Sequence, residues 1–293
     1  MVFPDWKGEL ILVYFVLVLG FILLTSQNIV KKKYQQISTS GVCFFSAIVA
    51  FCAMIVFASI NRNWSFDVRF LLPIIAFAIS YACATVGFLV SIRYGSLANS
   101  SLVLAYSLLI PTFYGIFFLH EPVSVKLIIG LVLIAVSLWL SNSQGAGGKI
   151  TWKWVVFILI GFFGNGMCST IQRQSILTYG EENIRLLMAC ALSISSVLML
   201  ISSFVMREKE IISVTLKKGW YLAVICGVVN ACSNLVFIYL NGRLPASVMF
   251  PVLSGGNLIT VFLYSLLFLK ESFSKKQYVG FFLGVAAVVI LNL

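Results

Sequence analysis

Charged side chains are scarce in this sequence. Asp, Glu, Lys and Arg make up 10% of the 293 residues, whereas soluble domains carry about 25%. None of the nine acidic residues lies in the middle of an apolar run, and the single histidine, His120, falls in a predicted loop. A membrane-embedded enzyme needs a buried acid, base or metal ligand. We therefore expect neither an enzyme nor a bound cofactor.

The sequence also lacks a cysteine framework and a basic cluster. Its seven cysteines all lie inside apolar runs, without a CxxC pair or a His/Cys group, which argues against a disulfide scaffold and a metal site. The net charge of +11 is spread over short connections. Such scattered charge is typical of residues that flank membrane spans, and it argues against a nucleic-acid partner.

Apolar residues dominate instead. They make up 61% of the chain, and the mean hydropathy is +1.05. Because a soluble protein needs a polar surface, lipid must be the solvent for most of this chain. A helix needs about 20 apolar residues to cross the hydrocarbon, and every tryptophan lies at or near the end of an apolar run. The predicted spans are 10–30, 39–60, 70–92, 97–119, 124–142, 153–175, 184–206, 219–240, 245–268 and 276–292.

The first five spans are repeated by the second five. Ten of the 35 positions in 108–142 are identical at the same register in 258–292. The earlier spans match with small gaps. The matched positions include Thr25 with Thr170, Gln27 with Gln172, Tyr81 with Asn230, Thr85 with Asn234, Glu121 with Glu271 and Gly130 with Gly280.

An odd number of spans in each half fixes the relation between the halves. Because five is odd, residues 1–143 and 144–293 start on opposite sides of the membrane. We therefore predict an all-α integral membrane protein of ten transmembrane helices, arranged as two inverted five-helix repeats around a central cavity. Two such halves can exchange shapes and open one site alternately to either side. A duplication kept for packing alone is the alternative.

Each half ends in a segment that carries Leu, Glu, Ser and Gly in the same register. These residues are Leu119, Glu121, Ser124 and Gly130, then Leu269, Glu271, Ser274 and Gly280. With them the chain resembles the drug/metabolite transporter (DMT) superfamily in its EamA-type branch, over nearly its whole length. The resemblance implies a multi-pass permease or exporter of small metabolites in the cell inner (plasma) membrane. It is almost silent on the substrate.

Glu121 and Glu271 have a direct physical interpretation. Each precedes a predicted helix, where unpaired N–H groups and the helix dipole favour an anion. We interpret both as scaffold residues of their own half. The orientation is left open, because Lys and Arg gather opposite the side of the termini, whereas the resemblance implies cytoplasmic termini.

Polar residues within the spans indicate where a substrate would bind, because in lipid they must face protein or water. Asn230 and Asn234 share one face of span 219–240, and Gln172 and Arg173 belong to a polar face of span 153–175. Hydrogen bonding between helices is the alternative for such residues. The predicted substrate-cavity residues are Thr25, Gln27, Asn28, Tyr81, Thr85, Tyr106, Ser107, Asn165, Ser169, Gln172, Arg173, Asn230, Asn234, Asn257 and Tyr264.

Two spans contain residues that weaken a helix. Pro111 lies inside span 97–119, and Pro251 precedes the pair Gly255 and Gly256 in span 245–268. Proline removes a backbone hydrogen bond, and a glycine pair loosens the helix further. We predict hinges or binding elements at these four residues, with a simple packing kink as the alternative.

Arg173 has no evident acidic partner in the spans. An unpaired guanidinium favours an anionic or carboxylate-bearing substrate, with snorkelling to the interface as the alternative. We predict a secondary transporter of a small polar metabolite, carboxylate-bearing such as an amino acid on this argument, and working by exchange or facilitated transport without a buried carboxylate. The alternative is a non-transporting membrane sensor or assembly subunit. The expected partners are the substrate and the lipid bilayer. The expected oligomeric state is a monomer, with a homodimer as the alternative.

Overall fold

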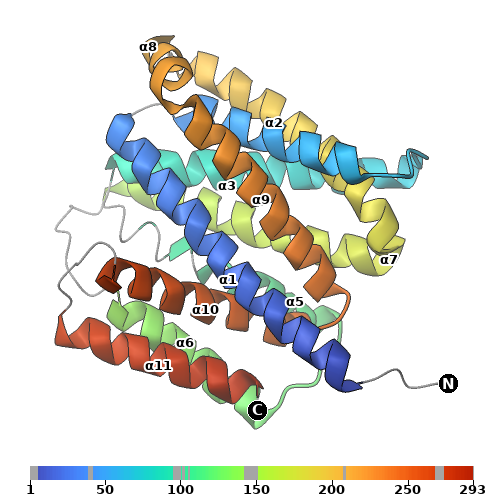
Figure 1. The fold of residues 1–293 in the computed structure, drawn as a ribbon, viewed down its shortest axis with the longest axis vertical. Coiled ribbons are helices and arrows are strands. Elements are labelled where there is room, and N and C mark those ends of the chain that lie inside the picture. The colour runs from blue at the N-terminus through green and yellow to red at the C-terminus, as the bar shows by residue number, and fades with distance from the viewer. Residues whose placement is uncertain are drawn as a thin grey trace.

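The computed structural model describes residues 6–38, 42–94, 100, 103–104, 106–141, 151–206, 209–267 and 274–292. Within these ranges the regular structure is entirely helical (Figure 1). The predicted all-α class is thus confirmed. The elements are α1 (Trp6–Ile37), α2 (Val42–Ile60), the 3₁₀ turn η1 (Val68–Phe70), α3 (Leu71–Tyr94), α5 (Leu109–Phe118), α6 (Val125–Ser141), α7 (Trp152–Val205), α8 (Lys209–Val214), the π-helical turn η2 (Thr215–Gly219), α9 (Trp220–Asn241), α10 (Ala246–Leu267) and α11 (Lys275–Asn292).

The predicted spans correspond closely to these helices. Each overlaps one of them, although the start of span 97–119 and the link at 142–150 fall partly or wholly outside the described residues. Spans 153–175 and 184–206 together form α7. A straight helix of its 54 residues would be about 80 Å long, far more than a bilayer requires. Gly180 interrupts it with φ 80° and ψ 167°, a conformation open to glycine alone, and the chain reverses there (Figure 1).

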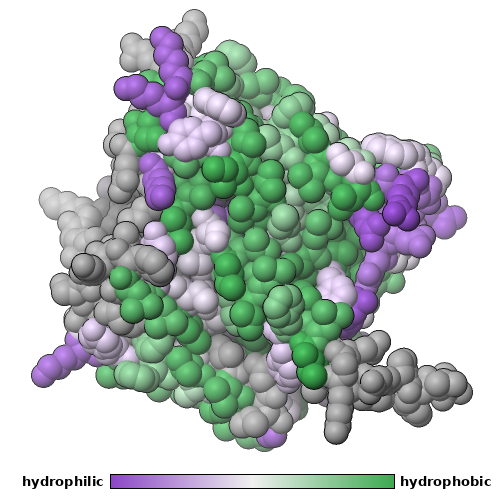
Figure 2. Space-filling model, in the orientation of Figure 1, coloured by the Kyte–Doolittle hydropathy of each residue, from purple (hydrophilic) through white to green (hydrophobic). Residues whose placement is uncertain are grey.

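The outer surface is apolar, as expected for a protein in lipid. Five of the described helical segments are long and apolar enough to cross a membrane. Large side chains such as Phe15, Leu72 and Phe204 are exposed. Figure 2 shows apolar residues across the middle of one face and hydrophilic residues toward its edges. Because water would not tolerate such a surface, the chain is a multi-pass integral membrane protein.

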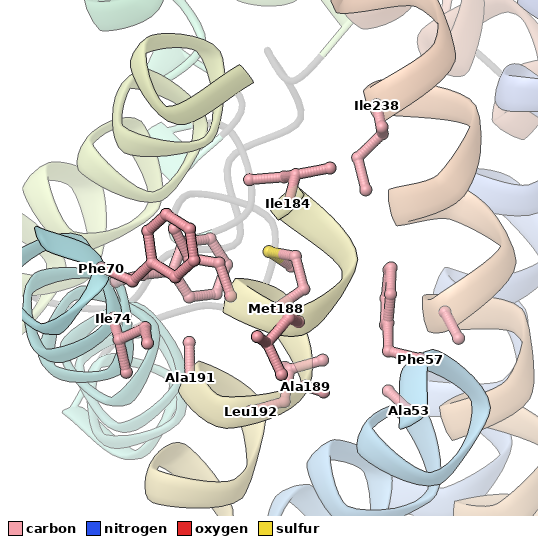
Figure 3. Packing of buried hydrophobic residues seen from close by; sticks show 14 of the residues in the cluster. Ala53, Phe57, Phe70, Ile74, Ile184, Met188, Ala189, Ala191, Leu192 and Ile238 are labelled. Atoms are coloured by element: carbon pink, nitrogen blue, oxygen red, sulfur yellow. The ribbon is translucent and has the colours of Figure 1, made fainter. Parts of the chain in front are cut away.

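The main apolar core forms around the second half of α7. Met188, Ile184 and Leu192 of α7 are almost fully buried there. Figure 3 shows this segment with Phe70 of η1 and Ile74 of α3 on one side and with α2 and α9 on the other side. A second core gathers residues of α1, α9 and α10 with α6 and α11. Helix α9 contributes to both cores, with Ala231 and Ile238 in the first and Val236 and Leu240 in the second.

Close backbone contacts join the helices of the two halves. An added Cβ at Gly87 of α3 would lie 2.5 Å from the backbone nitrogen of Gly161 of α7. One at Gly164 would lie 2.5 Å from the nitrogen of Ala84. At another edge of the molecule α6 packs against α11, and the Ser137 hydroxyl donates to the Gly280 carbonyl at 2.6 Å. Small residues of this kind let helices approach in lipid, where no hydrophobic force drives them together.

The two prolines at which hinges are predicted lie at different places in their helices. Helix α10 runs unbroken through Pro251, Gly255 and Gly256, and the hinge or binding role of these residues stays a prediction. An added Cβ at Gly256 would lie 2.3 Å from the Phe21 ring, and its small size therefore serves the contact of α1 with α10. Pro111 instead lies in the first turn of α5, where the missing N–H costs nothing.

Candidate functional site

A chain of hydrogen bonds joins α7, α9 and α1 inside the helix bundle. Gln172 Nε2 donates to Asn234 Oδ1 at 3.4 Å, and Asn234 Nδ2 donates to Asn230 Oδ1 at 3.2 Å. Asn230 Nδ2 then donates to Gln27 Oε1 at 3.2 Å, and Gln27 Nε2 donates to Ser233 Oγ at 2.8 Å. We call these five residues the amide network. The side chains of Asn230, Asn234 and Gln27 each donate and accept a hydrogen bond in it, and that of Gln172 donates one.

The amide network lies deep in the membrane-spanning part. Asn230 is ten residues into the 22-residue helix α9, about 15 Å from its start. Gln27 and Gln172 are buried, with 6% and 3% of their surface exposed. A buried carboxamide is unfavourable unless it is hydrogen-bonded, and here each amide serves as partner to the next. The network is therefore a polar, uncharged zone enclosed by apolar helices.

Two smaller polar contacts bring together other predicted residues. The Thr25 hydroxyl of α1 contacts Asn257 Oδ1 of α10 at 3.3 Å and also bonds the Thr260 hydroxyl. Asn165 Nδ2 of α7 donates to the Ser107 hydroxyl just before α5 at 2.6 Å. Both contacts join the first half of the chain to a helix of the second half.

The remaining predicted residues are more dispersed. The Tyr106 hydroxyl donates to the Ala135 carbonyl at 2.7 Å, beside a small pocket that Tyr106 shares with Pro251 and Ser254. Asn28 is exposed on α1. The others are half-buried: Tyr81, which stacks on Phe77, then Thr85, Ser169 and Tyr264.

Arg173 lies on α7 beside the network residue Gln172, and its guanidinium is paired. Its Nη2 donates to Glu121 Oε1 at 3.2 Å, and each of these side chains is only 9% exposed. Its Nη1 donates to the backbone carbonyls of Asn241 and of Leu244, the latter at 3.0 Å. The expectation of a guanidinium without an acidic partner is therefore wrong. The view that no carboxylate is buried is also wrong, since the side chain of Glu121, within the α5–α6 connection, is only 9% exposed.

Glu121 caps a helix of the other half. Its Oε1 accepts the backbone N–H of Ala246 at 2.8 Å, and its Oε2 accepts that of Ser247 at 2.7 Å. Both N–H groups belong to the first turn of α10, where the helix dipole favours an anion. The sequence predicts a capping role for Glu121, but at the start of the helix that follows it in its own half. Glu271, its repeat mate, lies outside the described residues.

We call Glu121, Arg173 and the α9–α10 connection (residues 241–247) the ion-pair knot. The carboxylate sits at the N-terminus of α10 and the guanidinium at the C-terminus of α9, so each charge also faces the favourable end of a helix dipole. A second pair, Glu181 with Arg243, lies nearby at 3.1 Å, but both of its side chains are about 40% exposed. The buried pair and the exposed pair thus differ chiefly in their contact with solvent.

Comparison with known proteins agrees with this picture. The fold and its apolar exterior define an all-α integral membrane protein. Within that class, residues 6–143 match the model of the EamA-like transporter family, which confirms the resemblance to the EamA-type branch of the DMT superfamily. This is a family of membrane transporters and not of enzymes.

Two further comparisons add the fold and nothing on the substrate. A solved structure titled only as the crystal structure of a protein superposes with a TM-score of 0.70 at 11% identity, over 95% of this chain and 94% of its own. No curated protein matches the chain.

Proposed function

We propose that this protein is a secondary transporter that moves a small polar metabolite across the cell inner (plasma) membrane by alternating access. The EamA-type match supports a membrane transporter of the DMT type. The proposal rests on one observation: Gln27 and Gln172, matched positions of the two halves, both hydrogen-bond to the neighbouring asparagines of α9.

The packing of the helices supports two inverted halves, residues 1–143 and 144–293. Exchanging the halves interchanges the packed pairs. Under the repeat, α1 corresponds to the first half of α7, α3 to α9, and α5 to α10. The contact of α3 with α7 therefore corresponds to that of α9 with α1, and the contact of α5 with α7 to that of α10 with α1. Matched helices also pack on each other: α6 on α11, α5 on α10, and α2 on the second half of α7. Such a pattern is expected for two similar bundles related by a twofold axis.

The amide network supplies the chemistry for a polar substrate. When the halves separate, the bonds between Gln27 and α9 break and leave buried amide groups without partners, at a cost of about 1–3 kcal/mol each. A solute with its own donors and acceptors offsets this cost by taking the vacated positions. Without substrate, the separated halves would bear the whole free-energy cost of the broken hydrogen bonds. Movement of the halves is therefore coupled to the presence of substrate.

The charged groups favour exchange or facilitated transport and argue against a proton relay through a carboxylate. Among the described residues, the buried carboxylate is that of Glu121, and it accepts three hydrogen bonds from Arg173, Ala246 and Ser247. A carboxylate held in this way serves as an ion-pair partner and as a helix cap, and all three of its bonds go to groups of the second half. Transport then follows the substrate gradient or a countersubstrate.

Replacing Gln27 with leucine tests the network. We expect at least a tenfold fall in the rate of exchange, because Asn230 Nδ2 and Ser233 Oγ lose their partner and a substrate loses a contact. Counterflow in proteoliposomes measures it, with labelled amino acids, other carboxylates, nucleosides and sugars as the solutes.

Ser26→Ala is the matched control on the same helix. Its hydroxyl donates only to the carbonyl of Ile22 in its own helix turn, at 2.8 Å, so exchange should stay within twofold of the wild-type rate. Equal rates for Gln27→Leu and the wild type, at equal amounts of folded protein, would remove the amide network from the transport pathway.

A further inference from the structure

The ion-pair knot divides between the two halves in an informative way. The donors all belong to the second half: Arg173 of α7 and the backbone N–H groups of Ala246 and Ser247. The acceptor, Glu121, belongs to the first half. The second half thus carries a complete carboxylate-binding site, and in this structure the first half fills it.

Two residues of the ion-pair knot also carry polar groups without a partner in the part of the chain that the structure describes. Arg173 Nε has no hydrogen-bond partner among the described residues, and neither does the side-chain amide of Asn241. Arg173 and Asn241 are 7% and 1% exposed. A structural ion pair that evolved only to close the knot would be expected to satisfy these groups, because a buried polar group without a partner is costly. The site offers more donors than the Glu121 carboxylate uses.

The site also lies in line with the amide network. Asn241 follows Asn234 by seven residues on α9, which places both on one helix face, about 10 Å apart along the axis. Arg173 directly follows Gln172 on α7. A single small solute could therefore reach from one to the other, with its charged end toward the knot.

We propose that the transported substrate carries a carboxylate that replaces Glu121 in this site when the halves separate. Withdrawal of Glu121 leaves a guanidinium and a helix N-terminus without an anion, and this arrangement is strongly unfavourable. A substrate carboxylate restores the ion pair and both capping bonds. Closure returns Glu121 and expels the substrate from the site. This inference rests on the proposed transport function and names its substrate class.

Glu121→Ala tests the site directly. The substitution removes a CH₂–COO⁻ group, which is the size of acetate. The purified variant should melt about 5–8 °C below the wild type, and acetate should restore at least half of that loss, compared with chloride at the same ionic strength. Glu121→Ala/Arg173→Met should lose the acetate effect. Glu181→Ala, which opens the exposed pair, should show none.

The second measurement needs no variant. Wild-type protein in proteoliposomes is offered small carboxylic acids, each paired with its uncharged amide, in counterflow. At least one acid should exchange ten times faster than its amide. Amides that exchange as fast as their acids would overturn the substrate class, and so would the absence of an acetate effect, or one produced by phosphate alone.

The two proposals can fail separately. If acetate stabilises Glu121→Ala but no solute of any class exchanges, the anion site stands and the transport function falls. If neutral solutes alone exchange, transport stands and the carboxylate assignment falls.

Discussion

Replacing Arg173 with methionine lowers the free energy of unfolding by about 3–5 kcal/mol. The substitution leaves the buried Glu121 carboxylate without its cation, and it removes the donor to the carbonyls of Asn241 and Leu244 at the end of α9. Methionine preserves most of the side-chain volume, so the loss reports charge and hydrogen bonding and not a cavity. Denaturant unfolding of the purified protein measures it.

Two companion variants separate this effect from a general loss of charge. Arg243→Met breaks the exposed pair with Glu181 and should cost at most about 1 kcal/mol, because solvent screens that pair. Glu121→Gln in the Arg173→Met background removes the orphaned charge and should recover at least half of the lost stability. Equal stability of Arg173→Met and Arg243→Met would contradict a buried, stabilising pair.

Replacing Gly87 with alanine destabilises the protein by about 3 kcal/mol or more. The added Cβ would lie 2.5 Å from the nitrogen of Gly161 and 2.7 Å from the carbonyl oxygen of Phe157. These are backbone atoms, so α3 and α7 have to move apart along their crossing. The yield of monodisperse protein after extraction, and its melting temperature, should both fall.

Gly20→Ala is the matched control in α1. The nearest atoms to an added Cβ there are the ends of two flexible side chains, Leu253 Cδ2 at 3.1 Å and Val236 Cγ1 at 3.2 Å. They can rotate away, so this variant should stay within about 1 kcal/mol of the wild type. If both alanine variants behave alike, the α3–α7 crossing is looser than its geometry indicates.

The helices could be predicted from sequence because lipid imposes a simple rule on them. A run of about 20 apolar residues forms a helix in either half, and its limits follow from flanking Trp, Gly and charge. The apolar runs 39–60 and 219–240 therefore coincide with α2 and α9 to within a few residues. The chemical types of the site residues could also be predicted, since polar side chains within membrane spans must face protein or water.

The partners of those residues could not be predicted. Gln27 bonds Asn230 across 203 positions, and Arg173 pairs with Glu121 across 52. A helix N-terminus attracts any carboxylate that the fold brings near, and the sequence favours the nearest helix by default. Only the packing of α5 beside α10 shows that Glu121 reaches Ala246 instead. Pro251 lies inside the continuous helix α10, because neighbouring helices can support a proline that an isolated helix would not tolerate.

Gly180 has a mechanical consequence. It joins the two arms of α7 by one residue in an extended conformation, so the arms form a helical hairpin without slack. One arm carries Arg173, the other carries the core residue Met188, and the Met188 sulfur accepts Gln172 Nε2 at 3.9 Å. This short junction and this contact favour movement of the two arms together. In the mechanism proposed above, the bending would then fall on the links at 119–124 and 242–245, which flank the contact of Glu121 with Ala246.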